Sequence, residues 1–150
     1  MDSMIQGVII EPLTQISDEL GNVRHMLRCD SKHFTQFGEV YFSEIKTGAV
    51  KAWKRHLKMT QRFAVPAGMI RLVLFDNKND SVTFKKIEVL EIGEHIYNLV
   101  IIPPLVWYGF KCISSHTALI ANCTDIPHDP HEIERLDMKS KIIPYDWTTS

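Results

Sequence analysis

Residues 97–122 read YNLVIIPPLVWYGFKCISSHTALIAN and contain three short apolar runs separated by two turn signals. The runs are rich in the aliphatic and aromatic residues that favour strands. They are Tyr97–Ile102, Trp107–Ile113 and Thr117–Asn122. The separators, Pro103-Pro104 and Ser114-Ser115-His116, contain residues typical of tight reversals. Short strands joined by tight reversals are typical of all-β rolls, so this stretch predicts part of an antiparallel double-sheet roll.

The same pattern extends along the rest of the chain. Apolar runs of strand length recur between clusters of Gly, Pro, Asn, Asp or Ser, while helical periodicity is weak. The other predicted strands are Val8–Glu11, Val23–Arg28, Glu39–Ile45, Val50–Lys58, Met69–Asp76 and Thr83–Leu90. Many short strands joined by tight turns predict an all-β fold with little helix, arranged as an antiparallel double-sheet roll.

The chain is expected to fold as one domain, residues 1–150, because no repeat, low-complexity tract or flexible linker interrupts it. From Pro127 the composition changes to Pro-His-Asp-Pro-His-Glu, and Tyr145 and Trp147 follow near the end. Aromatic side chains are costly to leave in water. We therefore expect residues 127–150 to pack against the domain as a C-terminal covering segment over one end of the roll.

Composition argues against several functional classes. The 150 residues carry 17 basic and 18 acidic side chains, so no broad field attracts nucleic acid or an anionic membrane. Three widely spaced cysteines, Cys29, Cys112 and Cys123, indicate reduced, buried thiols. The chain shows neither a signal-peptide pattern at its start nor an apolar run of membrane-span length. We expect a cytoplasmic protein with no nucleic-acid or membrane partner.

Residues 50–56, VKAWKRH, place two bases on one strand face. Strand alternation puts Lys54 and His56 together with two small apolar residues, and Lys51 on the opposite face. If the first face points into the roll, desolvation lowers the pKa of Lys54 and suits it to act as a base or a cation. The alternative is a strand end that leaves the core, with both bases solvated.

Tyr108 follows the diproline turn in an aromatic strand and shares a face with Val106 and Phe110. Its ring is therefore expected to be buried, and its hydroxyl needs a partner or a cavity. A structural hydrogen bond is the default interpretation. A hydroxyl that takes part in proton transfer is the alternative.

Residues 124–132, TDIPHDPHE, concentrate groups that can ligate a metal. Metal sites in small rolls typically join two closely spaced histidines of one strand to an acid and a third histidine. Here His56 stands alone on its strand, and the cluster lies in a proline-interrupted loop. We expect no metal, with Asp125 and Asp129 capping turns. The sequence also lacks a glycine-rich phosphate loop and a Gly-x-Ser-x-Gly elbow, so no cofactor is expected.

Five segments occur in an order that is similar to a known family. They read FGEVYFS at 37–43, GAVKAWKRH at 48–56, IRLVLFD at 70–76, IPPLVWYGF at 102–110 and IPYDW at 143–147. Together they resemble the dTDP-4-dehydrorhamnose 3,5-epimerase family, and within it a short, divergent branch. The resemblance covers nearly the whole chain and implies a cupin-like antiparallel jelly roll and a homodimer. It also implies a metal-free reaction in which a base removes a proton next to the ketone of a nucleotide-linked keto-hexose and an acid returns one.

The resemblance implies roles for three catalytic positions. Lys54 falls where the family carries its base histidine, and His56 matches the second histidine of the short branch. Tyr108 stands where short-branch relatives often carry histidine, and it would serve as a replacement acid. Lys54 would then act as the base or stabilise the enolate.

Three further positions are implied to bind the substrate or orient the base. The family's arginine falls on Lys51, its following lysine on Arg62, and its orienting aspartate on Asp137. The main hypothesis is an epimerase or isomerase of a dTDP-4-keto-6-deoxyhexose in cell-surface polysaccharide biosynthesis. The alternative is a catalytically degenerate cupin that binds sugar nucleotides in a structural or regulatory role.

Overall fold

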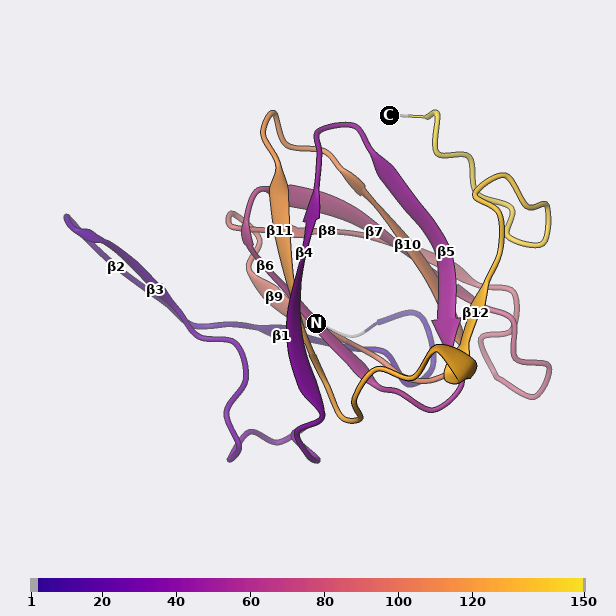
Figure 1. The fold of residues 1–150 in the computed structure, drawn as a ribbon. Coiled ribbons are helices and arrows are strands. Elements are labelled where there is room, and N and C mark those ends of the chain that lie inside the picture. The colour runs from indigo at the N-terminus through magenta and orange to yellow at the C-terminus, as the bar shows by residue number, and fades with distance from the viewer. Residues whose placement is uncertain (1–2, 150) are drawn as a thin grey trace.

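The computed structural model describes residues 3–149, and its strands form two five-stranded antiparallel sheets and a separate hairpin (Figure 1). The first sheet has the order β1-β9-β6-β11-β4 and the second β12-β5-β10-β7-β8, while β2 pairs with β3. The strands are β1 (Ile9–Pro12), β2 (Gln15–Asp18), β3 (Gly21–Arg24), β4 (Glu39–Ile45), β5 (Val50–His56), β6 (Gln61–Ala67), β7 (Met69–Asp76), β8 (Ile87–Gly93), β9 (Asn98–Ile102), β10 (Val106–Cys112), β11 (Ala118–Thr124) and β12 (Ile133–Arg135). A single 3₁₀ turn, Pro130–Glu132, precedes β12.

The predicted all-β roll with little helix is confirmed. Strands β4 and β7 begin and end where alternation places them. The sequence interpretation missed β6, because Gln61, Arg62 and Pro66 interrupt the apolar pattern that marks a strand. It also started β8 too early: Thr83 lies in a loop, where its hydroxyl donates to the Asp76 carboxylate.

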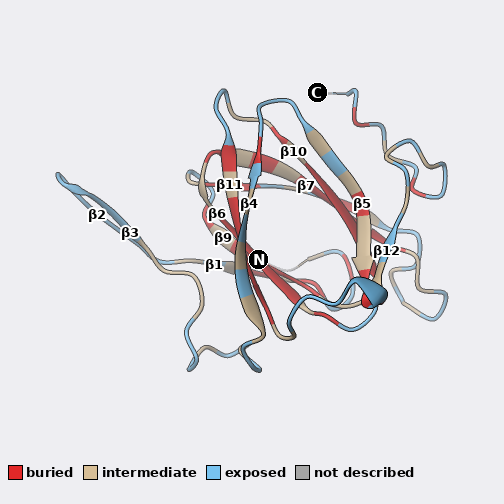
Figure 2. Cartoon of the chain, in the orientation of Figure 1, coloured by how far each residue is buried: buried red, intermediate tan, exposed pale blue. Residues whose placement is uncertain are grey.

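The hydrophobic core lies between the two sheets. On β7, Ile70, Leu72 and Leu74 point inward and are buried with Val65 and Ile120 of the first sheet. Figure 2 shows the buried residues gathered on the central strands, whereas the β2–β3 hairpin is exposed and projects away from the roll. The packed interior is therefore centred on β7. A cavity lies beside it, between β4 and β5.

The C-terminal segment lies against the outer face of the second sheet, next to β5 (Figure 1). The Trp147 and Trp53 ring centroids are 5.1 Å apart, and Ile143 and Tyr145 join the same cluster. The aromatic residues near the C-terminus thus pack against the domain, at the outer face of the second sheet. Strands β5 and β10 turn Trp53 and Trp107 outward, so it is the outer sheet face that needs an apolar cover.

The three cysteines are free, and Cys112 and Cys123 are buried as expected. Cys29 is exposed, so the prediction of a buried thiol was wrong there, because the residue lies in the loop beyond β3 rather than on a strand. Within residues 3–149, no helix is both long and apolar enough to cross a membrane.

Candidate active site

A cavity of about 300 Å³ lies between the two sheets. One wall comes from β4, β11 and β6 of the first sheet, and the facing wall from β5 and β10 of the second. The segment at β12 contributes to the rim. The lining residues are Tyr41, Ser43, Lys51, Ala52, Trp53, Lys54, Phe63, Tyr108, Phe110, Ile120, Asn122, Arg135 and Leu136.

Lys54 projects into this cavity from β5, next to Tyr108 of β10, with which it is paired in the sheet register. Within residues 3–149, its ammonium forms no ion pair and no hydrogen bond. Burial lowers the pKa of the Lys54 amine below its ordinary value, and the nearby Arg135 guanidinium lowers it further. A lysine of this kind carries a larger neutral fraction near neutral pH than a solvated one, which is what a general base needs.

Lys51 also lines the cavity, although simple alternation places it on the opposite face from Lys54. The register between β5 and β10 shifts between Tyr108 and Gly109, so that Phe110 pairs with Lys51 while Tyr108 pairs with Lys54. Such a bulge reverses the direction of the following side chains. The Lys51 ammonium donates to the Ser43 hydroxyl and to the Glu44 carbonyl, both at 3.1 Å, and so reaches across to β4.

The Tyr108 hydroxyl is part of a polar network that crosses between the two walls. It donates to Gln61 Oε1 at 3.1 Å. Asn122 Nδ2 donates to the same Gln61 oxygen at 3.0 Å and to the Tyr41 hydroxyl at 2.9 Å. Burial strongly raises the pKa of Tyr108 and also raises that of Tyr41, so both phenols keep their protons. The Tyr108 hydroxyl therefore makes a structural hydrogen bond, as the default interpretation predicted. The Tyr108 ring also lines the cavity.

His56 is 3% exposed and lies behind Tyr108 rather than among the lining residues. The two rings are nearly parallel, with centroids 6.4 Å apart. His56 Nδ1 contacts a carboxylate oxygen of Glu132. Burial lowers the pKa of His56 although Glu132 opposes the shift, and we assign a neutral ring whose Nδ1–H donates to Glu132. Its Nε2 is buried and has no partner within residues 3–149.

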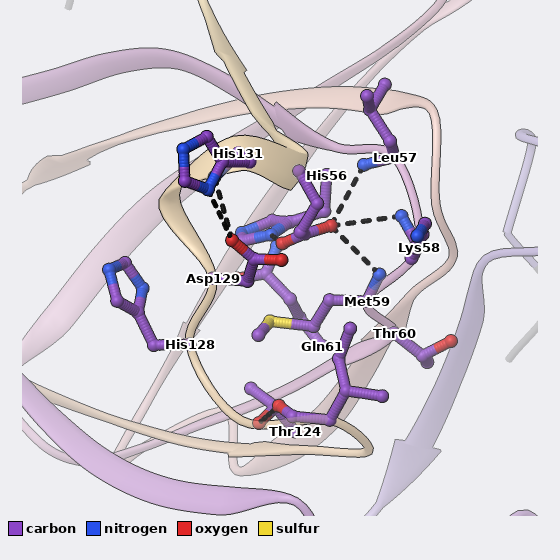
Figure 3. A network of polar contacts seen from close by, with 12 residues as sticks. His56, Leu57, Lys58, Met59, Thr60, Gln61, Thr124, His128, Asp129 and His131 are labelled. Carbon is purple, nitrogen blue, oxygen red and sulfur yellow. Dashed lines mark hydrogen bonds and ion pairs between the residues drawn. The ribbon is translucent and has the colours of Figure 1, made fainter.

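Glu132 also holds the turn that follows β5, whose residues Leu57, Lys58 and Met59 are labelled in Figure 3. Its second carboxylate oxygen accepts from the backbone N–H groups of Leu57, Lys58 and Met59 at 3.1, 3.0 and 3.2 Å. Burial alone would raise the pKa of Glu132, but the hydrogen bonds from His56 and from this backbone outweigh it and lower the pKa. The residue beside His56 is thus Glu132 and not Asp137.

Two residues assigned to the site by resemblance lie elsewhere. Arg62 is buried on the other face of β6, where its guanidinium donates to the His33 carbonyl and the Thr35 hydroxyl. Its neighbour Gln61 faces the cavity network instead, and a one-residue slip in the alignment across the turn is enough to exchange the two. Asp137 is exposed and caps its own loop by accepting from the Lys139 N–H.

The loop after β11 shows turn caps rather than a ligand cluster. Asp129 accepts from the His131 N–H at 3.0 Å, which confirms its expected role as a turn cap, whereas Asp125 accepts from the Thr60 N–H at 2.8 Å and so joins this loop to the segment before β6. His128 and His131 belong to this segment, and Figure 3 shows their rings apart from the His56 ring. In residues 3–149, no three His, Cys, Asp or Glu side chains are grouped to hold a metal ion.

Comparison with known proteins places the chain among sugar epimerases. A crystal structure of a dTDP sugar isomerase from Desulfovibrio desulfuricans G20 is 47% identical, with a TM-score of 0.95 and coverage of 98% of this chain and 94% of the other. The probable low-salt glycan biosynthesis epimerase Agl13 of Haloferax volcanii is 32% identical over 144 residues, 95% of this chain and 89% of the relative.

The dTDP-4-dehydrorhamnose 3,5-epimerase of Elizabethkingia anophelis is 16% identical, and its TM-score of 0.83 over 100% of this chain and 86% of the other shows the shared fold. No protein-family model matches the chain. The resemblance inferred from five sequence segments is nevertheless confirmed by relatives that span nearly the full length. The chain shares its fold with a dTDP-4-dehydrorhamnose 3,5-epimerase, and it belongs to the family of sugar epimerases and isomerases that includes the dTDP sugar isomerase of Desulfovibrio desulfuricans and the epimerase Agl13.

Proposed function

We propose that this chain is a nucleotide-sugar epimerase or isomerase that acts on a dTDP-4-keto-6-deoxyhexose in cell-surface polysaccharide biosynthesis. One observation carries the proposal: the Lys54 amine lies in a polar cavity without a carboxylate partner within residues 3–149. The names of the relatives, a dTDP sugar isomerase and a glycan biosynthesis epimerase, support the substrate class.

Lys54 is the base in this proposal. Its neutral amine takes the proton from the carbon next to the ketone, and the C–H electron pair forms a carbon–carbon double bond. The carbonyl π pair moves to the ketone oxygen, which becomes an enolate oxygen. His56 lies behind Tyr108 and not at the cavity surface, so we assign it a positioning role that acts through the Tyr108 ring.

The negative charge of the substrate is matched by two cations at the cavity. Lys51 and Arg135 are both exposed and both line it, on the same side as Lys54. We assign them to the diphosphate of the nucleotide and to the enolate, which a nearby positive charge stabilises. The cavity volume of about 300 Å³ is at the lower end for small-ligand sites, about 300–1,000 Å³, and so suits the hexose with the nucleotide outside.

Solvent exchange tests the proposed reaction. In D₂O, a dTDP-4-keto-6-deoxyhexose incubated with the wild-type protein should acquire deuterium at the carbon next to the ketone. Lys54→Met should abolish this exchange while the melting temperature stays near that of the wild type. Lys58→Met is the matched control, because Lys58 is exposed on the turn after β5 and should exchange normally.

Binding without exchange would refute the enzyme. If the wild-type protein binds the sugar nucleotide tightly in a calorimeter but incorporates no deuterium, the degenerate sugar-nucleotide-binding cupin is the correct function. The reason to consider this alternative is that Lys54 stands where the resemblance implies a base histidine.

We also propose that the chain forms a homodimer through the β4 edge of the first sheet. Within residues 3–149, β4 pairs with β11 only, and its neighbouring surface exposes Phe37, Val40 and Phe42. Two copies of an antiparallel edge can pair about a two-fold axis, which also covers the apolar side chains. Light scattering should give twice the 17.3 kDa chain mass. Phe42→Glu should reduce the measured mass to that of one chain. Val82→Glu, at an exposed loop position, should leave the measured mass unchanged.

A further inference from the structure

The two tyrosines of the cavity are not equivalent as proton donors. Asn122 Oδ1 accepts from the Arg62 backbone N–H at 3.1 Å, which fixes the orientation of the Asn122 amide. Both N–H bonds of that amide are then used, one toward Gln61 and one toward Tyr41. The Tyr41 oxygen therefore acts as an acceptor in this network, and the Tyr41 hydroxyl proton is not donated to any member of it.

Tyr108, unlike Tyr41, donates its hydroxyl proton within the network. Its hydroxyl proton is committed to Gln61 Oε1, deep in the core, and the residue is 4% exposed. Tyr41 is only partly buried, and its hydroxyl proton has no acceptor among the described residues. Of the two, Tyr41 is the phenol that can present a proton to a molecule in the cavity.

The positions of the strands lead to the same residue. Tyr108 pairs with Lys54 in the register of β10 and β5, so the two side chains stand next to each other on one wall. Tyr41 comes from β4 of the other sheet and lines the facing wall. Inversion at carbon needs the proton to leave from one face and return to the other, which requires donor and acceptor on opposite sides of the sugar.

We propose that Tyr41 is the acid that returns a proton to the carbon on the face opposite Lys54. This inference rests on the proposed function. The enolate's carbon–carbon π pair takes the Tyr41 hydroxyl proton, the carbonyl reforms, and Tyr41 is left as a phenolate. The phenolate regains a proton from water, while the Lys54 ammonium releases the one it took, so the turnover is balanced. Asn122, Gln61 and Tyr108 are positioning residues that hold the acceptor side of the Tyr41 oxygen.

Tyr41→Phe separates proton removal from proton return. In D₂O, the wild type should give inverted product that carries deuterium. With Tyr41→Phe, Lys54 still removes the proton and can return deuterium to the same face, so exchange should persist without inversion. We expect the inversion rate to fall about 100-fold or more, the usual contribution of a general acid, with exchange reduced far less. Tyr97→Phe is the matched control, since it removes a phenol hydroxyl outside the cavity.

Two results would overturn the inference. One is inversion by Tyr41→Phe at near the wild-type rate. The other is equal loss of exchange and inversion in a folded Tyr41→Phe protein, which would show a purely structural role. If Tyr41→Phe does not fold, 3-fluorotyrosine at position 41 should move the alkaline limb of the inversion profile to lower pH, because fluorine acidifies the phenol. An unmoved limb would count against Tyr41. A wild-type protein with no exchange at all would refute the proposed function instead.

Discussion

Replacing Glu132 with Gln tests the carboxylate that links His56 to the turn after β5. The buried carboxylate accepts from four donors, namely the His56 ring and the backbone N–H groups of Leu57, Lys58 and Met59. A hydrogen bond to a charged group contributes about 1.5–3 kcal/mol and a neutral one about 0.5–1.5 kcal/mol, so neutralisation removes roughly 1 kcal/mol from each. Gln is easier to bury than a carboxylate, which offsets part of the loss.

The free energy of unfolding should therefore fall by about 2–4 kcal/mol at pH 7. For a chain of this length, a loss of about 3 kcal/mol lowers the melting temperature by about 6–12 °C. Urea unfolding at pH 7 measures the difference directly. Glu134→Gln is the matched control: Glu134 pairs with Arg55 near the surface, where such a pair contributes about 0–1 kcal/mol.

The pH dependence gives a second check. The folded protein lowers the pKa of Glu132 below 4.5, so this stabilisation is complete above pH 4.5 and is lost as the pH falls through the folded pKa. Burial lowers the pKa of His56 below 6.5, so both proteins lose stability as the pH falls below 6.5, and the narrowing caused by Glu132 itself is expected below pH 4.5. The stability gap between wild type and Glu132→Gln should narrow in acid. A gap of under about 1 kcal/mol at pH 7, or one that persists unchanged to pH 3, would refute the reasoning.

Two further predictions concern the strand that carries Lys54 and its neighbour. The exchange rate should rise with pH through a midpoint below 10.5, because burial lowers the pKa of Lys54, and Arg135→Gln should raise that midpoint because the guanidinium lowers the pKa as well. A midpoint that moves down or not at all would exclude this coupling. Gly109→Ala should destabilise the protein by about 1–3 kcal/mol, because its Cβ would lie 2.6 Å from Ala52 Cβ and 2.9 Å from Trp147. Adding Ala52→Gly should restore part of the loss in urea unfolding, and no recovery would show that the Ala52 contact does not cause it.

The sequence predicted the fold well because most strands follow simple alternation. On β4 and β7 the apolar pattern alone located the ends. It failed at β6, where Gln61 and Arg62 are buried for reasons of tertiary packing that no local pattern shows and Pro66 interrupts the apolar run. It failed at the start of β8 because Thr83, which was predicted to begin the strand, binds the Asp76 carboxylate together with Ser81 and closes a loop.

The site was harder to predict because single-residue shifts change the direction of side chains. Lys54 was placed at the cavity correctly, whereas the bulge at Tyr108 and Gly109 that turns Lys51 inward has no signature in the sequence. A one-residue slip in the alignment likewise assigned Arg62 to the site, where the structure places Gln61. Tyr41 and Asn122 were missed altogether. A signal existed for Tyr41, since Val40 and Phe42 are apolar on the alternate positions, but only the structure shows which face is inside.

The packing of Trp147 against Trp53 has a consequence for biosynthesis on the ribosome. Synthesis runs from the N-terminus, so β5 emerges long before the residues that back it. Until residues 143–147 have left the exit tunnel, the back of the Lys54 strand has no aromatic cover. A nascent chain that stalls or terminates before residue 143 would therefore present Trp53 to chaperones instead of burying it.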